Sequence, residues 1–243
     1  LLHLHEESGE TAKVVETLRE VIDHCPSDHS YRQRLIGLLQ EEGRNAEAAT
    51  EWVRRAGVYL EAGAPRQAAD ALNAAVRLDP DCQDALRTLM ELAEEDGALE
   101  EAGEYRRAFA FSLARAGAPE HAEEVLREGV LANPRDFETH RALVDLYLEG
   151  PDADRRRAAA ALDELAERYE QAEQDEEAIA CRRELVELQG GGADRRMQFV
   201  DYLLERGRRE DAAAELEDLA AALRAEGQPA DALQVLARTL EIE

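Results

Sequence analysis

A proline recurs at a fixed interval along this chain, and a similar stretch of residues follows it each time. Pro26, Pro80 and Pro134 lie 54 residues apart, and Gly190-Gly191-Gly192 stands where a fourth proline would fall. A repeat of this length is typical of proteins in which each unit packs only on its neighbours. The sequence therefore predicts one array with a partial unit and four full units, at about 1–26, 27–80, 81–134, 135–190 and 191–243.

Each full unit is predicted to contain three helices. Apolar residues recur at i, i+3, i+4 and i+7, as in Leu216–Leu223, and no segment alternates with the period of a strand. The chain is rich in Ala, Leu, Glu and Arg, which favour helices. A glycine ends one predicted helix and a proline begins the next at three places, Gly63 and Pro65, Gly117 and Pro119, and Gly227 and Pro229. The predicted fold class is all-α.

The charge balance excludes several classes of partner. The chain has 55 acidic residues against 29 Lys and Arg, which gives a formal charge of −26. This charge repels phosphate backbones and anionic lipid head groups, so we expect neither nucleic acid nor a membrane surface as partner. No apolar run approaches the ~18 residues that a membrane span needs, so membrane insertion is not expected.

The cysteine spacing and the excess of Arg over Lys indicate the compartment and the kind of organism that the chain comes from. Cys25, Cys82 and Cys181 are far apart and lack the spacing of a disulfide framework or a zinc site, which favours a reducing compartment. We expect Cys82 and Cys181 to be buried or half-buried filler. Lys13 is the one lysine, and this bias toward Arg is typical of a GC-rich bacterial genome. The sequence thus predicts a cytoplasmic bacterial protein.

No residue pattern in the chain predicts catalysis or metal binding. The few serines lack a glycine-flanked elbow, and the glycines at 190–192 lack the lysine of a phosphate-binding loop. We therefore predict no enzyme, no catalytic residues, no cofactor and no metal. The histidines and the cysteine near the N-terminus lack metal-ligand spacing and are expected at helix ends or on loop surfaces: His3, His5, His24, Cys25 and His29.

Large and small residues alternate through the first full unit at a spacing that resembles the tetratricopeptide repeat (TPR). The matching positions are Trp52, Ala56, Tyr59, Gly63, Ala68, Leu72, Ala75 and Pro80, whereas Arg55 replaces the usual leucine-like residue. The resemblance implies a right-handed TPR-like α-solenoid of about fourteen helices. A unit of 54 residues is shorter than two TPR motifs, so we expect one helix, about Asn45–Ala62, to serve two motifs. Trp52 and Tyr59 are expected to be core residues.

The resemblance also implies a function, because TPR arrays bind other proteins on a concave face lined by the first helix of each pair. This chain is expected to be a non-catalytic scaffold or adaptor that binds a partner protein or peptide there. Phe111 is a candidate anchor, although a partly packed aromatic between helices is the more favoured reading of this side chain. The predicted partner-binding residues are Gln33, Gln40, Val53, Gly57, Leu60, Arg87, Glu91, Arg107, Phe111, Arg141 and Asp145.

Two questions stay open from the sequence. Similar arrays in bacterial polarity and motility scaffolds make a small Ras-like GTPase one expected partner, while a structural spacer or self-association module is the alternative function. The segment Gly150–Arg157 lengthens the third unit, either as a tolerated surface insertion or as a basic protrusion. Leu1 and Glu243 both cut through repeat units, so we expect a fragment of a longer array.

Overall fold

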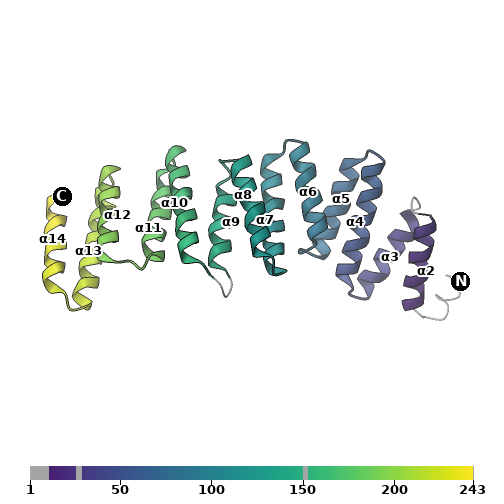
Figure 1. Ribbon diagram of the computed structural model, residues 1–243, viewed down its shortest axis with the longest axis horizontal. Helices are drawn as coiled ribbons and strands as arrows, with labels where there is room; N and C mark the ends of the chain where they lie inside the picture. Colours follow the sequence, from purple (N-terminus) through teal and green to yellow (C-terminus); the bar gives the residue numbers. More distant parts are fainter. Residues whose placement is uncertain (1–10, 26–28, 150–152, 243) are drawn as a thin grey trace. The chain divides into compact units, whose positions relative to one another are not determined.

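The computed structural model describes residues 11–25, 29–149 and 153–242, and these residues form thirteen α-helices and no strand (Figure 1). The all-α prediction is therefore confirmed. In chain order the helices are α2 (Thr11–His24), α3 (His29–Glu41), α4 (Asn45–Glu61), α5 (Pro65–Leu78), α6 (Gln83–Glu95), α7 (Leu99–Arg115), α8 (Pro119–Ala132), α9 (Phe137–Leu148), α10 (Arg155–Gln171), α11 (Asp175–Leu188), α12 (Ala193–Glu205), α13 (Arg209–Ala225) and α14 (Pro229–Ile242).

The helix lengths repeat with a period of three. The sets α3–α5, α6–α8 and α12–α14 each contain helices of 13, 17 and 14 residues, and α9–α11 differs only in a first helix of 12. We call these sets repeats one to four, from α3–α5 to α12–α14. The 17-residue helix α4 packs against both α3 and α5. The described residues thus form a TPR-like helical array.

The breaks between helices lie where the sequence predicts them. Gly63 has a φ of +69°, in the left-handed region that only glycine enters without strain, and its N–H donates to the Leu60 carbonyl at 3.0 Å. Pro65 then occupies the first turn of α5, where its missing N–H costs nothing. Gly117 and Gly227 follow α7 and α13 and also have a positive φ, of +85° and +80°.

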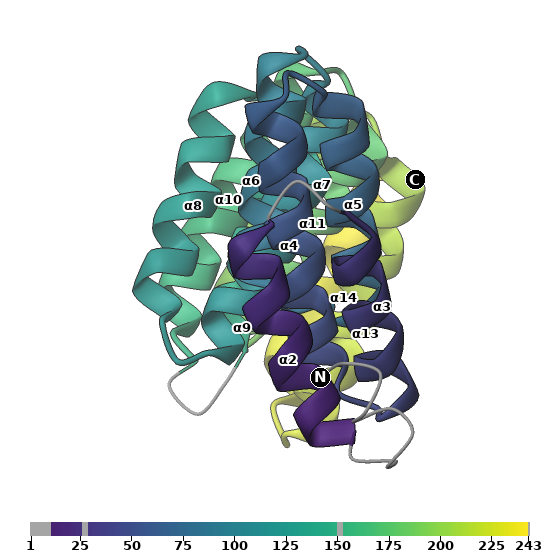
Figure 2. The same ribbon diagram turned by 90° about the vertical axis from the view of Figure 1, so that its right-hand side faces the viewer.

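The chain divides into two compact bodies, Leu1–Thr139 and His140–Glu243. In the N-terminal body the helices form two layers, with α4, α6 and α8 on one side and α3, α5 and α7 on the other (Figure 2). Side chains also join helices that are two apart, because Arg19 of α2 contacts Glu47 of α4 and Tyr105 of α7 contacts Asn73 of α5. Since a repeat has three helices, the equivalent helices α4 and α7 lie in opposite layers.

The core of repeat one is built from small residues, which let the helices approach closely. Ala56, Ala68 and Ala75 are buried in a cluster with Leu72 and others, and Trp52 and Tyr59 pack against it. The sequence predicts these two aromatic residues in the core, and the structure places them at its edge, where they are partly buried. Arg55, the departure from the TPR pattern, places its guanidinium 5.0 Å from the Trp52 ring centroid and 5.5 Å from that of Tyr59. The cation therefore stacks on the rings where a leucine is usual.

Repeat two accommodates a large change at the position of Trp52. Arg106 stands there, 54 residues on, and it is buried and paired with Glu94 of α6. Gly129 of α8 replaces the equivalent Ala75, and a Cβ at Gly129 would overlap the Arg106 side chain. The glycine is therefore required by packing, since its missing methyl makes room for the arginine.

The connection before α10 is shorter in the structure than the sequence indicates. Residues 150–152 lie outside the described part, but Arg155–Arg157 form the first turn of α10 rather than part of a basic loop. Asp154 caps this turn by accepting from the N–H groups of Arg156 and Arg157 at 3.0 and 3.1 Å. Arg157 also stacks on Tyr147, at 4.5 Å from its ring centroid.

Candidate functional site

The predicted partner-binding residues of the N-terminal body lie in two layers. Two helices of one layer, α4 and α6, carry Val53, Gly57, Leu60, Arg87 and Glu91. Two helices of the other layer, α3 and α7, carry Gln33, Gln40, Arg107 and Phe111. The predicted residues of this body therefore lie on helices of two layers rather than one, because the 17-residue helices α4 and α7 are in opposite layers. Arg141 and Asp145 lie on α9 in the C-terminal body.

Most of the predicted cations are engaged within the chain. Arg107 donates to Asp136 at 3.2 Å and to Thr139 at 3.3 Å, at the start of α9. Arg141 donates to Glu184 of α11 at 2.5 Å and to Asp145 at 3.1 Å. Hydrogen bonding to Glu184 raises the pKa of Arg141, and this pairing joins α9 to α11. These two arginines thus have structural partners already.

The set on α4 leaves an open, partly apolar surface. Gly57 lies in the middle of α4, and a Cβ built there would meet nothing within 4 Å. Leu60, one turn further on, is 36% exposed. A mid-helix glycine costs about 1 kcal/mol relative to alanine. A side chain at position 129 would overlap Arg106, whereas no described contact requires a glycine at position 57.

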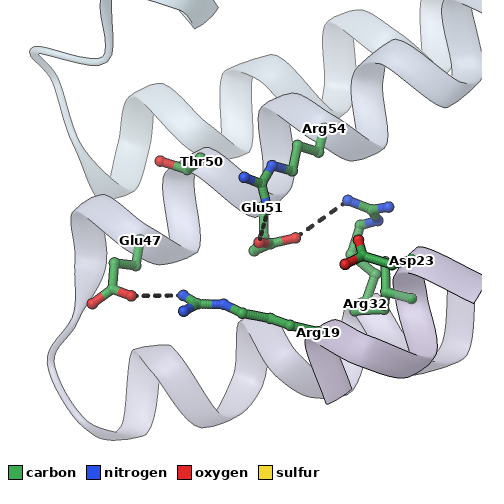
Figure 3. A pocket seen from close by; sticks show the side chains of 8 residues that line it. Arg19, Asp23, Arg32, Glu47, Thr50, Glu51 and Arg54 are labelled. Atoms are coloured by element: carbon green, nitrogen blue, oxygen red, sulfur yellow. Dashed lines mark hydrogen bonds and ion pairs between the residues drawn. The ribbon is translucent and has the colours of Figure 1, made fainter. Parts of the chain in front are cut away.

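A polar pocket, which we call the arginine pocket, opens between α2, α3 and α4 (Figure 3). Its volume is about 470 Å³. The close view shows the charged side chains of the three helices converging on it. The residues that line it are Arg19, Ile22, Asp23, Arg32, Glu47, Thr50, Glu51 and Arg54.

A buried ion pair forms part of the pocket wall. Arg32 Nη1 donates to Glu51 at 3.2 Å, and the two side chains are only 6% and 3% exposed. Glu51 also accepts from Arg54 at 2.8 Å, so each of its oxygens has a donor. The Nε of Arg32 is buried and has no hydrogen-bond partner among the described residues. Burial lowers the pKa of Arg32, because removal from water penalises the charged form.

The remaining two carboxylates of the pocket differ in their partners. Glu47 accepts from Arg44 and from Arg19, each at 2.7 Å, and both of its oxygens are engaged. Hydrogen bonds from Arg44 and then Arg19 lower the pKa of Glu47 to about 2. Asp23 lies beside Arg32 in Figure 3, and its charge opposes the fall in the Arg32 pKa.

The C-terminal body contains a pocket at the same position of the repeat. Its volume is about 520 Å³, and it opens between α11, α12 and α13. We call it the C-terminal pocket. Eight of its residues lie 164 positions after those of the arginine pocket, namely Arg183, Val186, Glu187, Arg196, Asp211, Ala214, Glu215 and Asp218.

The two pockets differ in charge and in donor use. Arg196, the equivalent of Arg32, donates its Nε to Glu215 at 2.5 Å, so this nitrogen has a partner. Asp218 stands at the position of Arg54. The arginine pocket has three arginines and three carboxylates, whereas the C-terminal pocket has two arginines and four carboxylates.

The sequence analysis predicts neither pocket, because it considers only the concave groove that the TPR resemblance implies. The sequence does contain a pattern that indicates them. Arg32 and Glu51 are 19 residues apart, and Arg196 and Glu215 repeat both residues and the spacing at the equivalent positions. Charged residues of opposite sign that recur together at a helix-packing position indicate a pair across two helices.

The described part of the chain offers no group of three or more His, Cys, Asp or Glu residues that could hold a metal ion. His3 and His5 lie outside it. Burial raises the pKa of the Cys181 thiol to about 11 and also raises that of the half-buried Cys82, so both fit the predicted role of filler. Within the described residues, no helix is both long and apolar enough to cross a membrane.

No model of a protein family matches the chain, and no curated protein matches it either. Similar solved structures include the apo form of RapI, with 9% identity and a TM-score of 0.40 over 99% of this chain and 94% of that one. The Rap conjugation gene regulator of plasmid pLS20, in complex with the Phr* peptide, has 12% identity and a TM-score of 0.36 over 99% of this chain and 71% of that one. MamA has 15% identity and a TM-score of 0.31 over 80% of this chain and 91% of that one. At these values none of the three fixes a function for this chain.

Proposed function

We propose that this chain is a non-catalytic scaffold that binds a partner protein or peptide on the surface of its helical array. The surface comprises the two sets of residues described above, with the set on α4 and α6 as the better candidate in the N-terminal body. Arg107 already has partners within the chain, whereas Leu60 is partly exposed. Partly exposed apolar side chains rimmed by polar ones are typical of protein-binding surfaces.

The observation that supports this function most strongly is Gly57. The residue weakens α4, yet the space around its Cα is empty, so the fold gains nothing from the glycine. A partner that approaches the helix backbone closely would gain from the missing side chain. Leu60 lies on the same side of α4 and supplies an apolar contact.

Short peptides selected from a random library against the full chain provide the test. Gly57→Trp places a large ring on this face of α4, where a Cβ meets nothing within 4 Å, so we expect at least a tenfold loss of affinity for the selected peptides. Gln67→Trp adds the same ring to an exposed position of α5 and should leave the affinity unchanged. Equal affinity in both variants would contradict a binding surface on α4.

The resemblance stated above makes a small Ras-like GTPase one partner to test, but the comparisons give it no support. The test is direct binding of purified bacterial GTPases of this class, in their GDP and GTP forms, to the full chain. Absence of binding to every one of them would remove this partner and leave the peptide-binding proposal intact.

Self-association is a second candidate, and α14 favours it. Leu233 and Leu240 of this helix are 69% and 76% exposed. Their equivalents in repeat one, Ala69 and Val76, pack against a cluster that includes residues of α6. The apolar stripe of α14 is therefore the face on which a further helix would pack, and self-association would supply that helix from a second copy. Sedimentation should show a concentration-dependent dimer that Leu233→Asp abolishes, and a monomer at all concentrations would exclude this candidate.

A further inference from the structure

We propose that a further pocket of the C-terminal body binds a phosphoryl group, held by the guanidinium groups of Arg155, Arg156 and Arg195. We call it the basic pocket. It opens between α10, the end of α11 and the start of α12, and its volume is about 430 Å³. None of its lining residues belongs to the proposed partner-binding surface, so the two proposals can be tested separately.

The basic pocket is positively charged although the chain as a whole is strongly acidic. Three arginines and one carboxylate line it, in a chain whose formal charge is −26. The carboxylate, Asp163, is paired with Arg182 of α11, which is not a lining residue. By contrast, the arginine pocket has equal numbers of arginines and carboxylates, and the C-terminal pocket has more carboxylates than arginines. The basic pocket is therefore the one of these three pockets that attracts an anion.

The donors of the basic pocket are accessible and largely unused. Arg155 and Arg156 are exposed, and neither side chain has a hydrogen bond or an ion pair within the described residues. Arg195, also exposed, donates through Nη1 to the Gln189 carbonyl at the end of α11. This contact holds the third guanidinium at the pocket and leaves its other N–H groups available. A ligand can thus reach N–H groups of all three arginines.

The start of α10 does not by itself account for Arg156. The equivalent residues of the other repeats are Ala46, Glu100 and Glu210. Acidic residues favour the first turn of a helix, because the helix N-terminus carries a partial positive charge, and an arginine there opposes it. Asp154 already accepts from the first-turn N–H groups, so the guanidinium groups and not the helix end would hold a ligand.

A phosphoryl group matches these donors better than a carboxylate does. At neutral pH it carries a charge of about −2 and three acceptor oxygens. A carboxylate carries a single charge and two oxygens. Arginine clusters bind phosphoryl groups through paired N–H···O bonds. Ala159 and Ala160 border the same space, and their small side chains leave room for the group. The negative charge of the whole chain disfavours nucleic acid and anionic membranes, so the ligand is an isolated phosphoryl group.

Titrations of the full chain, followed by the ¹H–¹⁵N NMR signals of the arginine Nε–H groups, test the proposal. The probes are inorganic phosphate, acetyl-Gly-phosphoserine-Gly-amide, acetyl-Gly-Ser-Gly-amide and acetyl-Gly-Glu-Gly-amide. We expect one or both phosphoryl probes to shift the signals of the three pocket arginines and to leave that of the exposed Arg66 in place. A shift with phosphate alone assigns the pocket to free phosphate, and a shift with the phosphopeptide alone assigns it to a phosphorylated partner.

The two other peptides provide the controls. The serine peptide should have no effect, and the glutamate peptide should bind at least fivefold more weakly than the better phosphoryl probe. No shift with either phosphoryl probe, an equal shift at Arg66, or equal binding of the glutamate peptide would overturn the proposal. If library peptides bind α4 but no phosphoryl probe moves these signals, the basic pocket is not a site and the partner-binding function stands.

Matched charge changes complete the test. Arg156→Glu gives α10 the residue of α7 and α13 at this position and should weaken phosphoryl binding at least tenfold. Arg209→Glu makes the same charge change in the first turn of α13, outside the pocket, and should leave binding unchanged. Arg156→Ala copies repeat one and serves if the glutamate disturbs folding. Equal binding in the Arg156 and Arg209 variants would overturn the proposal.

Discussion

Arg32 and Glu51 of repeat one occupy the same two positions of the three-helix unit as Leu86 and Tyr105 of repeat two. Leu86 is buried, and the hydroxyl of the half-buried Tyr105 donates to Asn73 at 3.2 Å. The fold therefore accepts an uncharged pair where repeat one buries an ion pair. Since desolvation of two charges offsets much of their attraction, stability alone does not explain the ion pair. The comparison predicts that an uncharged pair can replace Arg32 and Glu51 without loss of the fold.

Removing one charge of the pair should have the largest effect. Glu51→Leu leaves Arg32 buried without its acceptor, and we expect the free energy of unfolding to fall by about 3–5 kcal/mol. Hydrogen exchange of the α3 amides measures this loss locally. The matched variant Glu215→Leu breaks the equivalent pair in repeat four, which is more exposed at 18% and 14%, and should cost about 2 kcal/mol at α12. Equal losses would contradict the role given to burial.

A substitution at a second pair of equivalent positions should change the free energy of unfolding by a smaller amount. Repeat one has Trp52 and Ala75 where repeat two has Arg106 and Gly129. Gly129→Ala forces its methyl into Arg106, and we expect a loss of about 1–3 kcal/mol in urea unfolding. Gly57→Ala meets empty space and should instead stabilise α4 by about 1 kcal/mol. A loss in both variants would show that the two glycines do not differ in their packing.

The smallest effect concerns the titration of Glu47. Its pKa, lowered to about 2 by Arg44 and Arg19, is below the ordinary value of 4.5. A lowered carboxylate pKa stabilises the fold above the ordinary value, and this contribution is lost as the pH falls from 4.5 toward 2. Arg44→Gln should move the pKa back toward the ordinary value, as ¹³C NMR of the Glu47 carboxyl would show. An unchanged pKa would exclude Arg44 as the main cause.

Much of the fold follows from the sequence, because helix ends depend on local chemistry. The glycines at 63, 117 and 227 and the prolines that follow them mark real boundaries, and a 17-residue helix recurs once in each repeat. The layer of each helix does not follow so directly. The predicted partner-binding residues were placed on one concave face, as in arrays of two-helix repeats. In this three-helix repeat the equivalent helices α4 and α7 lie in opposite layers.

The arginine pocket could not be predicted in the same way, because it depends on contacts between helices rather than on a local pattern. Arg19 and Glu47 are 28 residues apart, and Arg32 and Glu51 are 19 apart. Whether such residues meet depends on the crossing of α2, α3 and α4. The partner-binding residues on α4 and α7 remain predictions, while the roles of Arg107 and Arg141 within the chain became visible only in the structure.

The variant Arg32→Leu/Glu51→Tyr, which gives repeat one the residues of repeat two, tests the central claim most directly. Trp52, the single tryptophan, lies in α4 and reports unfolding of this region in urea. The account predicts a free energy of unfolding within about 1 kcal/mol of the parent chain. A variant that is destabilised by several kcal/mol would contradict it.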